Sequence, residues 1–427
     1  MVTLVRSPGG GGHVKCWERL TEAAAATPNL VDLTVYFLGP TERTTELGSN
    51  ARFVTLPPRL GTGRFDRRAR GPGATDLAPF HAGLARSLPR HHVWHVTDTF
   101  AFGSTARILA RRSGRPLAGS VHTDLPRFTR VYSRQVAAAL LGKRGVARVL
   151  LDAVPLERWV ERLARKRVDT LLRSCRHVLV SNDHDHDEVA RLIPADRIGR
   201  LRRGIDKELF HPRRANRRRL THRYGVPADV PVILFAGRID GSKRALTVAR
   251  AVRRLVDRGV PCHLFMAGHG GDTEEVRGLL GPAVTLPGHL PQRELAWVYA
   301  SADVFAFPSE TETVGNVVAE AMAAGLPVVL PRGANTAQWL ARPGRDGLLV
   351  GDRSTSAWAT ALETLVRDGA ACAAMGRRAR DTVERLLPTW SDVLIEDLVP
   401  VWRMLMDPAH PGAGPVGPFQ DVGIPAA

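Results

Sequence analysis

The sequence is poor in cysteine, lysine and aromatic residues, and it contains no long hydrophobic run. Its four cysteines are widely separated, without the close pairs of a metal site or a disulfide framework. The longest apolar stretches, such as residues 231–236 and 327–331, fall far short of the ~20 residues that span a bilayer. The N-terminus lacks a basic region followed by an apolar core, so we expect no signal peptide. These absences favour a reduced, cytoplasmic protein.

The chain is nevertheless strongly basic, and arginine supplies nearly all of the excess. Lysine and arginine number 60 against 42 acidic residues, which gives a formal net charge of +18. A positive field of this kind attracts nucleic acid, an anionic membrane surface or phosphorylated small molecules; a merely solvated arginine-rich surface is the alternative. Because aromatic residues make up only 6% and no zinc-finger or RNP-like spacing occurs, we expect no nucleic-acid partner.

Hydrophobic strand patterns alternate with helical patterns along the chain, which predicts an α/β protein with parallel sheets. The strands expected in the first half are residues 2–5, 33–38, 93–96, 117–121 and 177–180. A new series starts near residue 231, with strands expected at 232–235, 263–266, 284–286, 304–307, 327–330 and 348–350. Two such series predict two doubly wound, Rossmann-like domains that face a central cleft.

We expect the N-terminal domain at residues 1–207, on the acceptor side, and the C-terminal, nucleotide-sugar-binding domain at residues 208–395. Residues 396–427 form a C-terminal segment whose Pro/Gly-rich tail is expected to be disordered. A long basic amphipathic stretch runs from Arg134 to Arg176 in the first domain. Ligands of doubly wound sheets bind where strands end, so the loops after each strand are expected to carry the chemistry.

The most informative segment runs from Phe307 to Val329 and predicts a strand, a loop, a short helix and another strand. The helix is expected from Asn316 to Ala324, with Gly325 at its C′ position. The residues around its N-terminus, Val314, Gly315 and Asn316, offer free backbone N–H groups at the positive end of the helix dipole. Such a helix start is suited to phosphate oxygens.

Two glutamates of this segment, Glu312 and Glu320, are eight residues apart. This spacing resembles the E-x7-E signature of glycosyltransferase family four, the retaining group 1 glycosyltransferases with the two-domain GT-B fold. Other segments resemble the same family in the same order, and together they cover most of residues 1–400. They are residues 120–126 (Ser-Val-His-Thr-Asp-Leu-Pro), 204–212, 235–243 (Phe-Ala-Gly-Arg-Ile-Asp-Gly-Ser-Lys), 267–270, 287–290 and 302–309.

The resemblance implies a role for each catalytic candidate. Glu312 is implied to contact the hydroxyls of the transferred sugar, and a carboxylate can accept two hydrogen bonds from a diol. His122 is implied to hydrogen-bond the sugar near the reacting centre. Arg238 and Lys243 follow a buried strand, and their charges can stabilise a departing diphosphate.

The donor-binding residues implied by the resemblance are Gly11, Gly12, Gly268, Leu290, Val314, Gly315, Asn316 and Glu320, the last toward the nucleotide ribose. The glycine run at residues 9–12 is not GxGxxG, and no acidic residue is placed for a ribose, which argues against a dinucleotide enzyme. A plain strand-to-helix turn is the alternative for this loop. The run Asp-His-Asp-His-Asp at residues 183–187 is interpreted as a capped helix start, so we expect no metal site.

The sequence therefore predicts a retaining glycosyltransferase that moves a hexosyl group from a UDP- or GDP-linked sugar to a hydroxyl, with no metal or other cofactor. Two acceptors stay open: a small molecule such as an aminocyclitol or another secondary-metabolite aglycone, and a lipid. The lipid alternative places the basic stretch in peripheral contact with the anionic inner membrane face. A sugar phosphorylase and a non-catalytic basic binding protein of the same fold are further alternatives.

Overall fold

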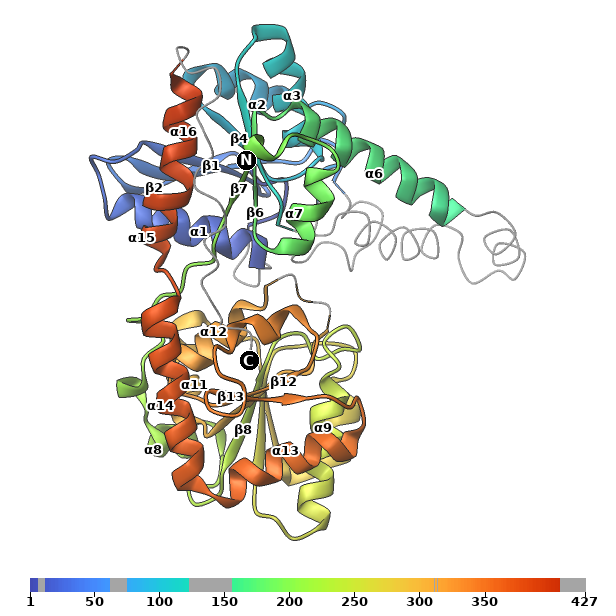
Figure 1. Cartoon of the computed structure of the whole chain (residues 1–427), viewed down its shortest axis with the longest axis vertical. Coiled ribbons are helices and arrows are strands. Elements are labelled where there is room, and N and C mark those ends of the chain that lie inside the picture. The colour runs from blue at the N-terminus through green and yellow to red at the C-terminus, as the bar shows by residue number, and fades with distance from the viewer. Residues whose placement is uncertain (7–11, 62–74, 123–155, 311, 313, 408–427) are drawn as a thin grey trace. The chain divides into compact units, whose positions relative to one another are not determined.

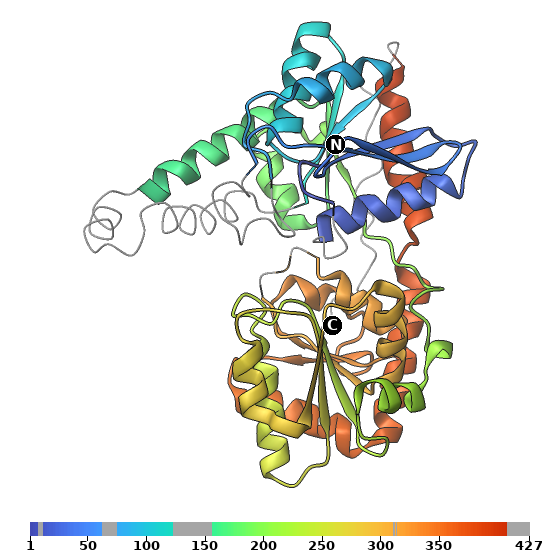
Figure 2. The same cartoon turned by 180° about the vertical axis from the view of Figure 1, so that it is seen from behind.

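The computed structural model describes residues 1–6, 12–61, 75–122, 156–310, 312 and 314–407. The chain folds into two compact units (Figures 1 and 2). Unit 1 consists of Met1–Arg203 together with the segment that begins at Trp390, and unit 2 spans Gly204–Thr389. This division differs from the boundaries expected at residues 207/208 and 395/396, because the chain returns to unit 1 near its end.

Unit 1 contains two sheets, and the N-terminal segment lies between them. The strands are β1 (Leu33–Leu38), β2 (Arg43–Gly48), β3 (Ala51–Leu56), β4 (Trp94–Val96), β5 (Leu117–Ser120), β6 (His177–Val180) and β7 (Ile198–Arg200), in the orders β1-β3-β2 and β4-β5-β6-β7. The Val2 N–H donates to the Tyr36 carbonyl at 2.9 Å, and the terminal amine donates to the His95 carbonyl at 2.7 Å. The strand expected at residues 2–5 is therefore a short bridging segment, with one parallel bridge from Val5 to β1.

The helices of unit 1 include three helical segments contributed from the far end of the chain. They are α1 (Gly12–Ala25), α2 (Ala82–Ser87), α3 (Ala101–Ser113), α6 (Leu156–Ser174), α7 (Asp183–Ala190), α15 (Trp390–Asp392), the π-helix Val393–Leu398 and α16 (Val399–Met406). Leu394, Leu398 and Trp402 are buried in one hydrophobic cluster with Trp17 and Leu20 of α1. This packing explains why residues 390–406 belong to unit 1 (Figure 1).

Unit 2 is built on one parallel sheet with helices on both faces (Figures 1 and 2). The strand order is β10-β9-β8-β11-β12-β13, from β8 (Val232–Ala236), β9 (His263–Ala267), β10 (Val284–Gly288), β11 (Val304–Ala306), β12 (Val328–Pro331) and β13 (Gly347–Val350). All six strands lie within about two residues of the expected ranges. In chain order this is 3-2-1-4-5-6, the Rossmann order, whose ligand crevice lies where the order reverses. That point falls between β8 and β11.

The helices of unit 2 cover the sheet and leave its strand ends free for loops. They are α8 (Arg217–Tyr224), α9 (Ala245–Asp257), α10 (Thr273–Leu280), α11 (Gln292–Ser301), α12 (Asn316–Ala323), α13 (Thr355–Arg367) and α14 (Gly369–Leu386). Every residue of β8, β9, β11 and β12 is buried, as expected for a parallel sheet covered on both faces. Each large apolar side chain buried here contributes about 1.5–3 kcal/mol to stability. The sheet is therefore a rigid support for the loops between β8 and β11.

Candidate active site

Lys243 and Glu312 form an ion pair at the carboxyl edge of the unit 2 sheet. Lys243 Nζ donates to Glu312 Oε1, although the two residues are 69 positions apart in the chain. The side chains are only 17% and 22% exposed. Because β8 and β11 are neighbours in the sheet, the loops that follow them meet at this edge. The structure thus brings together two of the four predicted catalytic residues.

Arg238 lies on the same loop as Lys243 but is more exposed. Its Nη2 donates to Ser242 Oγ at 2.7 Å, and its Nη1 is 3.3 Å from Asp240 Oδ2. Asp240 also accepts the backbone N–H of Ser242 at 3.0 Å, which closes a tight turn before α9. The Arg238 side chain is 66% exposed, so its guanidinium is accessible to an anion.

Two side chains from the 3₁₀-helix Asn335–Trp339 hold the loop that carries Glu312. Asn335 Nδ2 donates to the Glu312 carbonyl at 3.1 Å, and Trp339 Nε1 donates to the Val314 carbonyl at 2.7 Å. The sequence analysis did not identify these residues. A usable signal existed, because the segment follows β12 and therefore lies at the same carboxyl edge.

Gly315 begins α12 in a conformation that requires glycine. Its φ is +74°, and a Cβ there would lie 2.4 Å from Thr336 Cγ2. Among the described residues, no side chain caps this end of the helix. The first backbone N–H groups of α12, beginning at Asn316, are therefore open to an acceptor, and the helix dipole favours a negative one. Phosphate binding by Val314, Gly315 and Asn316 stays a prediction.

Glu320 lies on α12 and is half-buried. Burial, followed by the Glu320 carboxylate, holds the pKa of the Tyr299 hydroxyl on α11 well above its ordinary value. Tyr299 itself is fully buried. In this structure Glu320 is thus an electrostatic neighbour of a core tyrosine, and its contact with a nucleotide ribose stays a prediction.

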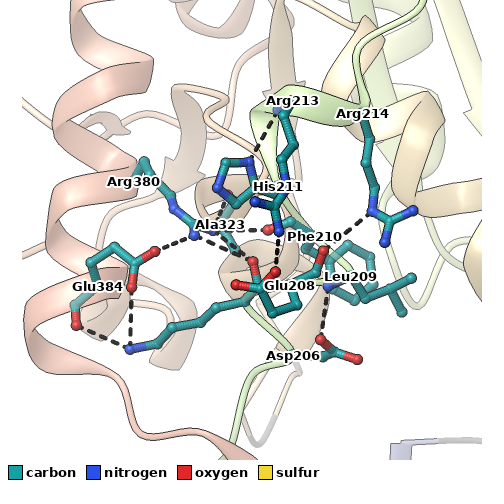
Figure 3. Close-up of polar contacts among 11 residues, drawn as sticks. Asp206, Glu208, Leu209, Phe210, His211, Arg213, Arg214, Ala323, Arg380 and Glu384 are labelled. Carbon is teal, nitrogen blue, oxygen red and sulfur yellow. Dashed lines mark hydrogen bonds and ion pairs between the residues drawn. The ribbon is translucent and has the colours of Figure 1, made fainter.

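The C-terminal end of α12 is fastened to the rest of unit 2. Gly325 has a φ of +83°, and Leu326 N–H donates to the Ala321 carbonyl at 3.0 Å, which confirms the predicted C′ glycine. Figure 3 shows Arg380 of α14 beside this end: its Nη1 donates to the Ala323 carbonyl at 2.6 Å and to the Phe210 carbonyl at 2.8 Å. A cation therefore neutralises the negative end of the helix whose other end faces the site.

Gly268 and Leu290 have structural roles at this edge. Gly268 has a φ of +151°, and a Cβ there would come within 1.8 Å of the Gly237 carbonyl oxygen, so only glycine permits this close approach. Leu290 is 9% exposed and belongs to the hydrophobic core. The donor contacts implied for both residues stay predictions.

His122 lies in unit 1, two residues after β5, and is 6% exposed. Its Nε2 is 2.7 Å from Ser120 Oγ, and its Nδ1 is 3.1 Å from Arg203 Nη2. Its ring stacks on His13 with centroids 4.5 Å apart. Burial, followed by the neighbouring His13 and Arg203, holds the pKa of His122 well below its ordinary value. The imidazole is therefore neutral near pH 7 and acts as a hydrogen-bonding group.

The remaining predicted positions are also found in unit 1. Gly12 is the first residue of α1 and is exposed, whereas Gly11 lies outside the described residues. The acidic run at residues 183–187 begins α7, and Asn182 caps that helix by accepting the Asp185 N–H at 2.8 Å. Within the described ranges, no group of three or more histidine, cysteine or acidic side chains is placed to hold a metal ion.

Comparison with known proteins places the chain in a family. Residues 230–368 match the family described as Glycosyl transferases group 1. The D-inositol 3-phosphate glycosyltransferase of Kineococcus radiotolerans is 30% identical over 362 residues, which cover 78% of this chain and 76% of that protein. The chain belongs to the group 1 glycosyltransferases, a family of transferase enzymes.

Two other relatives match over shorter stretches. The sulfoquinovosyl transferase of Arabidopsis thaliana is 33% identical over 187 residues, 43% of this chain and 36% of that protein. The D-inositol 3-phosphate glycosyltransferase of Saccharomonospora viridis is 36% identical over 224 residues, 49% of this chain and 51% of that protein. The chain thus spans about a third of the length of the first of these relatives and about half of the length of the second.

Solved structures share the fold at low sequence identity. The sucrose-phosphate synthase of Thermosynechococcus elongatus has a TM-score of 0.66 at 20% identity, covering 95% of this chain and 98% of that one. Anabaena HepE, solved in complex with UDP and glucose, has a TM-score of 0.62 at 16% identity, covering 94% and 99%. The predicted GT-B architecture of two Rossmann-like domains is confirmed.

Proposed function

We propose that the protein is a retaining glycosyltransferase that transfers a hexosyl group from a UDP- or GDP-linked sugar to the hydroxyl of a small acceptor. An aminocyclitol or another secondary-metabolite aglycone is the acceptor class we favour. The observation that carries the proposal is the Lys243–Glu312 pair beside the uncapped start of α12. It combines a cation and open N–H groups for a diphosphate with a carboxylate for sugar hydroxyls.

The site residues have different roles in the proposed reaction. The bond from the anomeric carbon to the diphosphate oxygen breaks, a bond from that carbon to the acceptor oxygen forms, and the hydroxyl proton passes to the departing diphosphate oxygen. Negative charge grows on the leaving diphosphate, where Arg238, Lys243 and the N–H groups at Asn316 stabilise it. Glu312 accepts hydrogen bonds from the transferred sugar and holds it in position.

Nucleotide binding tests this proposal directly. Thermal unfolding of the purified protein should shift upward with one of UDP, GDP, ADP or TDP, because a ligand that binds only the folded state stabilises it. At about 100 times its Kd, the gain is roughly 2.7 kcal/mol. Lys243→Ala should weaken the shift. The absence of a shift with all four nucleotides would contradict a nucleotide-sugar donor.

Transfer is expected to proceed without a divalent metal. Arg238 and Lys243 supply fixed positive charge beside the α12 start, which chelators cannot remove. Activity should therefore persist in excess EDTA, whereas Arg238→Ala and Lys243→Ala should each cost about 2–4 kcal/mol of transition-state stabilisation. Loss of activity in EDTA that Mg²⁺ or Mn²⁺ restores would show that this charge assignment is wrong.

A lipid acceptor is a second candidate, supported by the basic surface of α6. Exposed basic side chains on the part of this helix with described side chains are Arg162, Arg165, Lys166, Arg167 and Arg173. Residues 134–155 of the predicted basic stretch lie outside the described residues. No helix in the described part of the chain is both long and apolar enough to cross a membrane. The corresponding location is cytoplasmic, with peripheral contact at the inner membrane face.

If the acceptor is a lipid, the protein should sediment with anionic vesicles and be released by about 0.5 M salt, where the Debye length is only a few ångströms. Vesicles of neutral phosphatidylcholine are the control. Replacing Arg162, Lys166 and Arg173 together with glutamine should reduce the bound fraction. If the protein stays in the supernatant at low salt, the soluble acceptor is favoured.

A further inference from the structure

Arg203 is a buried cation of unit 1 that meets no carboxylate among the described residues. It is 8% exposed and follows β7 by three positions. Its Nη1 donates to Cys16 Sγ at 2.7 Å, and its Nη2 is 3.1 Å from His122 Nδ1. Its buried Nε has no hydrogen-bond partner in the described part of the chain. Because burying an unpaired charge is strongly unfavourable, such a residue is a candidate for binding an anion.

The preceding residue, Arg202, differs from Arg203 because it is paired with two carboxylates and has a structural role. Its Nη2 lies 2.7 Å from Asp397 and 2.5 Å from Glu396, and its backbone N–H donates to Asp397 at 2.7 Å. These pairs fasten the returning C-terminal helices to unit 1. Arg203 has no such pair in the described structure, so its guanidinium keeps a donor for a ligand.

His122 faces more donors than its neutral ring can accept. The indole N–H of Trp17 and the guanidinium of Arg203 can only donate, and they lie 3.3 Å from His122 Nε2 and 3.1 Å from His122 Nδ1, respectively. A neutral imidazole accepts at one of its two nitrogens, so one of these two donors is left without an acceptor on the ring.

His13 adds an unsatisfied group on another element. It lies in the first turn of α1, and its buried Nε2 has no hydrogen-bond partner among the described residues. Its ring is nearly parallel to that of His122, with an angle of 10°. Burial, followed by the charges of Arg203 and the N-terminus, lowers the pKa of His13 to about 3, so it remains a neutral hydrogen-bonding group.

We propose that Arg203 and His13 Nε2, beside His122, form a phosphoryl-binding subsite in unit 1, which holds the anionic group of a phosphorylated hydroxyl acceptor. The inference rests on the proposed function, and it narrows the acceptor class. Nitrogen donors from two separate segments suit the several oxygens of a phosphoryl group, and guanidinium binds such groups through paired N–H donors. A donor diphosphate has the same chemistry, so the test must separate the two sources.

The first arm measures inorganic phosphate binding to the full-length protein by calorimetry at constant ionic strength. Arg203→Gln should weaken phosphate binding at least about ten-fold, the scale of one charge-assisted hydrogen bond, and Arg203→Lys should be intermediate. Arg112→Gln, at an exposed position of α3, is the matched control and should bind phosphate like the wild type. Arg203→Gln should melt no lower than the wild type, because it removes an unpaired buried charge.

Two results of this arm would overturn the subsite: wild-type protein that does not bind phosphate, or Arg203→Gln protein that binds it as well as the wild type does. If Arg203→Gln fails to fold, the affinity of Arg203→Lys for phosphate decides the question. An unchanged affinity would show that Arg203 has a structural role and would overturn the subsite. A weaker affinity in folded Arg203→Lys supports the subsite, since lysine keeps the charge but loses the paired donors.

The second arm identifies the source of the phosphoryl group. With an acceptor subsite, Arg203→Gln should bind the nucleoside diphosphate within about three-fold of the wild type, while KM for polyol monophosphates rises at least about ten-fold. For the unphosphorylated parent alcohols, KM should not rise in Arg203→Gln. A ten-fold loss of nucleotide binding would overturn the acceptor assignment. If wild-type protein binds no nucleotide, the proposed function fails, yet the phosphate arm still decides the role of Arg203.

Discussion

Replacing Glu312 with glutamine should slow turnover at least ~100-fold while the protein stays folded, a typical scale for the loss of one active-site contact. Glutamine keeps the volume of the side chain but removes the charge that pairs with Lys243, and with it the carboxylate that we propose to accept hydrogen bonds from the sugar hydroxyls. The stability cost should be about 1 kcal/mol, because the ion pair is only partly buried. Steady-state kinetics and thermal unfolding of the purified variant measure both quantities.

Glu310 offers a matched control for this variant. It lies two residues away and is 25% exposed, and its carboxylate pairs with Arg244 and, at 2.7 Å, with Arg353. Glu310→Gln should therefore remove a similar ion pair with little effect on turnover. If it slows the reaction as much as Glu312→Gln does, the acidic loop is needed for its shape, and Glu312 has no separate role toward the sugar.

His122→Ala should also lower turnover at least ~100-fold, since it removes a hydrogen-bonding group from the edge of unit 1 where strands end. The lowered pKa of His122 keeps the ring neutral between pH 6 and 8. We therefore expect no acidic limb from this residue in the pH–rate profile over that range. Rates measured across that range, on the wild type and the variant, check both statements.

His95→Ala serves as its control, because His95 is buried and bonds to the other side of Ser120. Both variants lose a buried imidazole and should be destabilised to a similar extent. Only His122→Ala should lose most of its activity. Near wild-type turnover in purified His122→Ala would remove this residue from the active site.

Much of unit 2 could be predicted from the sequence because its signals are local. Each strand is a short apolar run ended by glycine or proline, so the pattern alone located all six. Gly325 was identified as the end of α12 because a left-handed residue after a helix is usually glycine. In unit 1, β2, β3 and β7 were not predicted. The residues of β2 are mostly exposed and polar, without an alternating apolar face.

The return of residues 390–406 to unit 1 is a property of tertiary structure. Trp402 and Leu398 would suit any apolar cluster, and only packing against α1 selects one. The partner of Arg202 follows from the same return, because Asp397 lies 195 positions further along the chain. No local pattern encodes such a separation, so sequence analysis assigned this segment to the second domain and to a separate tail.

The amino-acid sequence by itself determined the α/β class, the strands of unit 2 and the family-like positions of Glu312, Lys243 and His122. The tertiary structure decided which charges are paired. Lys243 meets Glu312 because β8 and β11 became neighbours, and Arg203 is left without a described carboxylate because those of the returning helix pair with Arg202. Hydrophobic periodicity reports burial of whole faces, whereas the environment of a single charged side chain depends on contacts between distant segments.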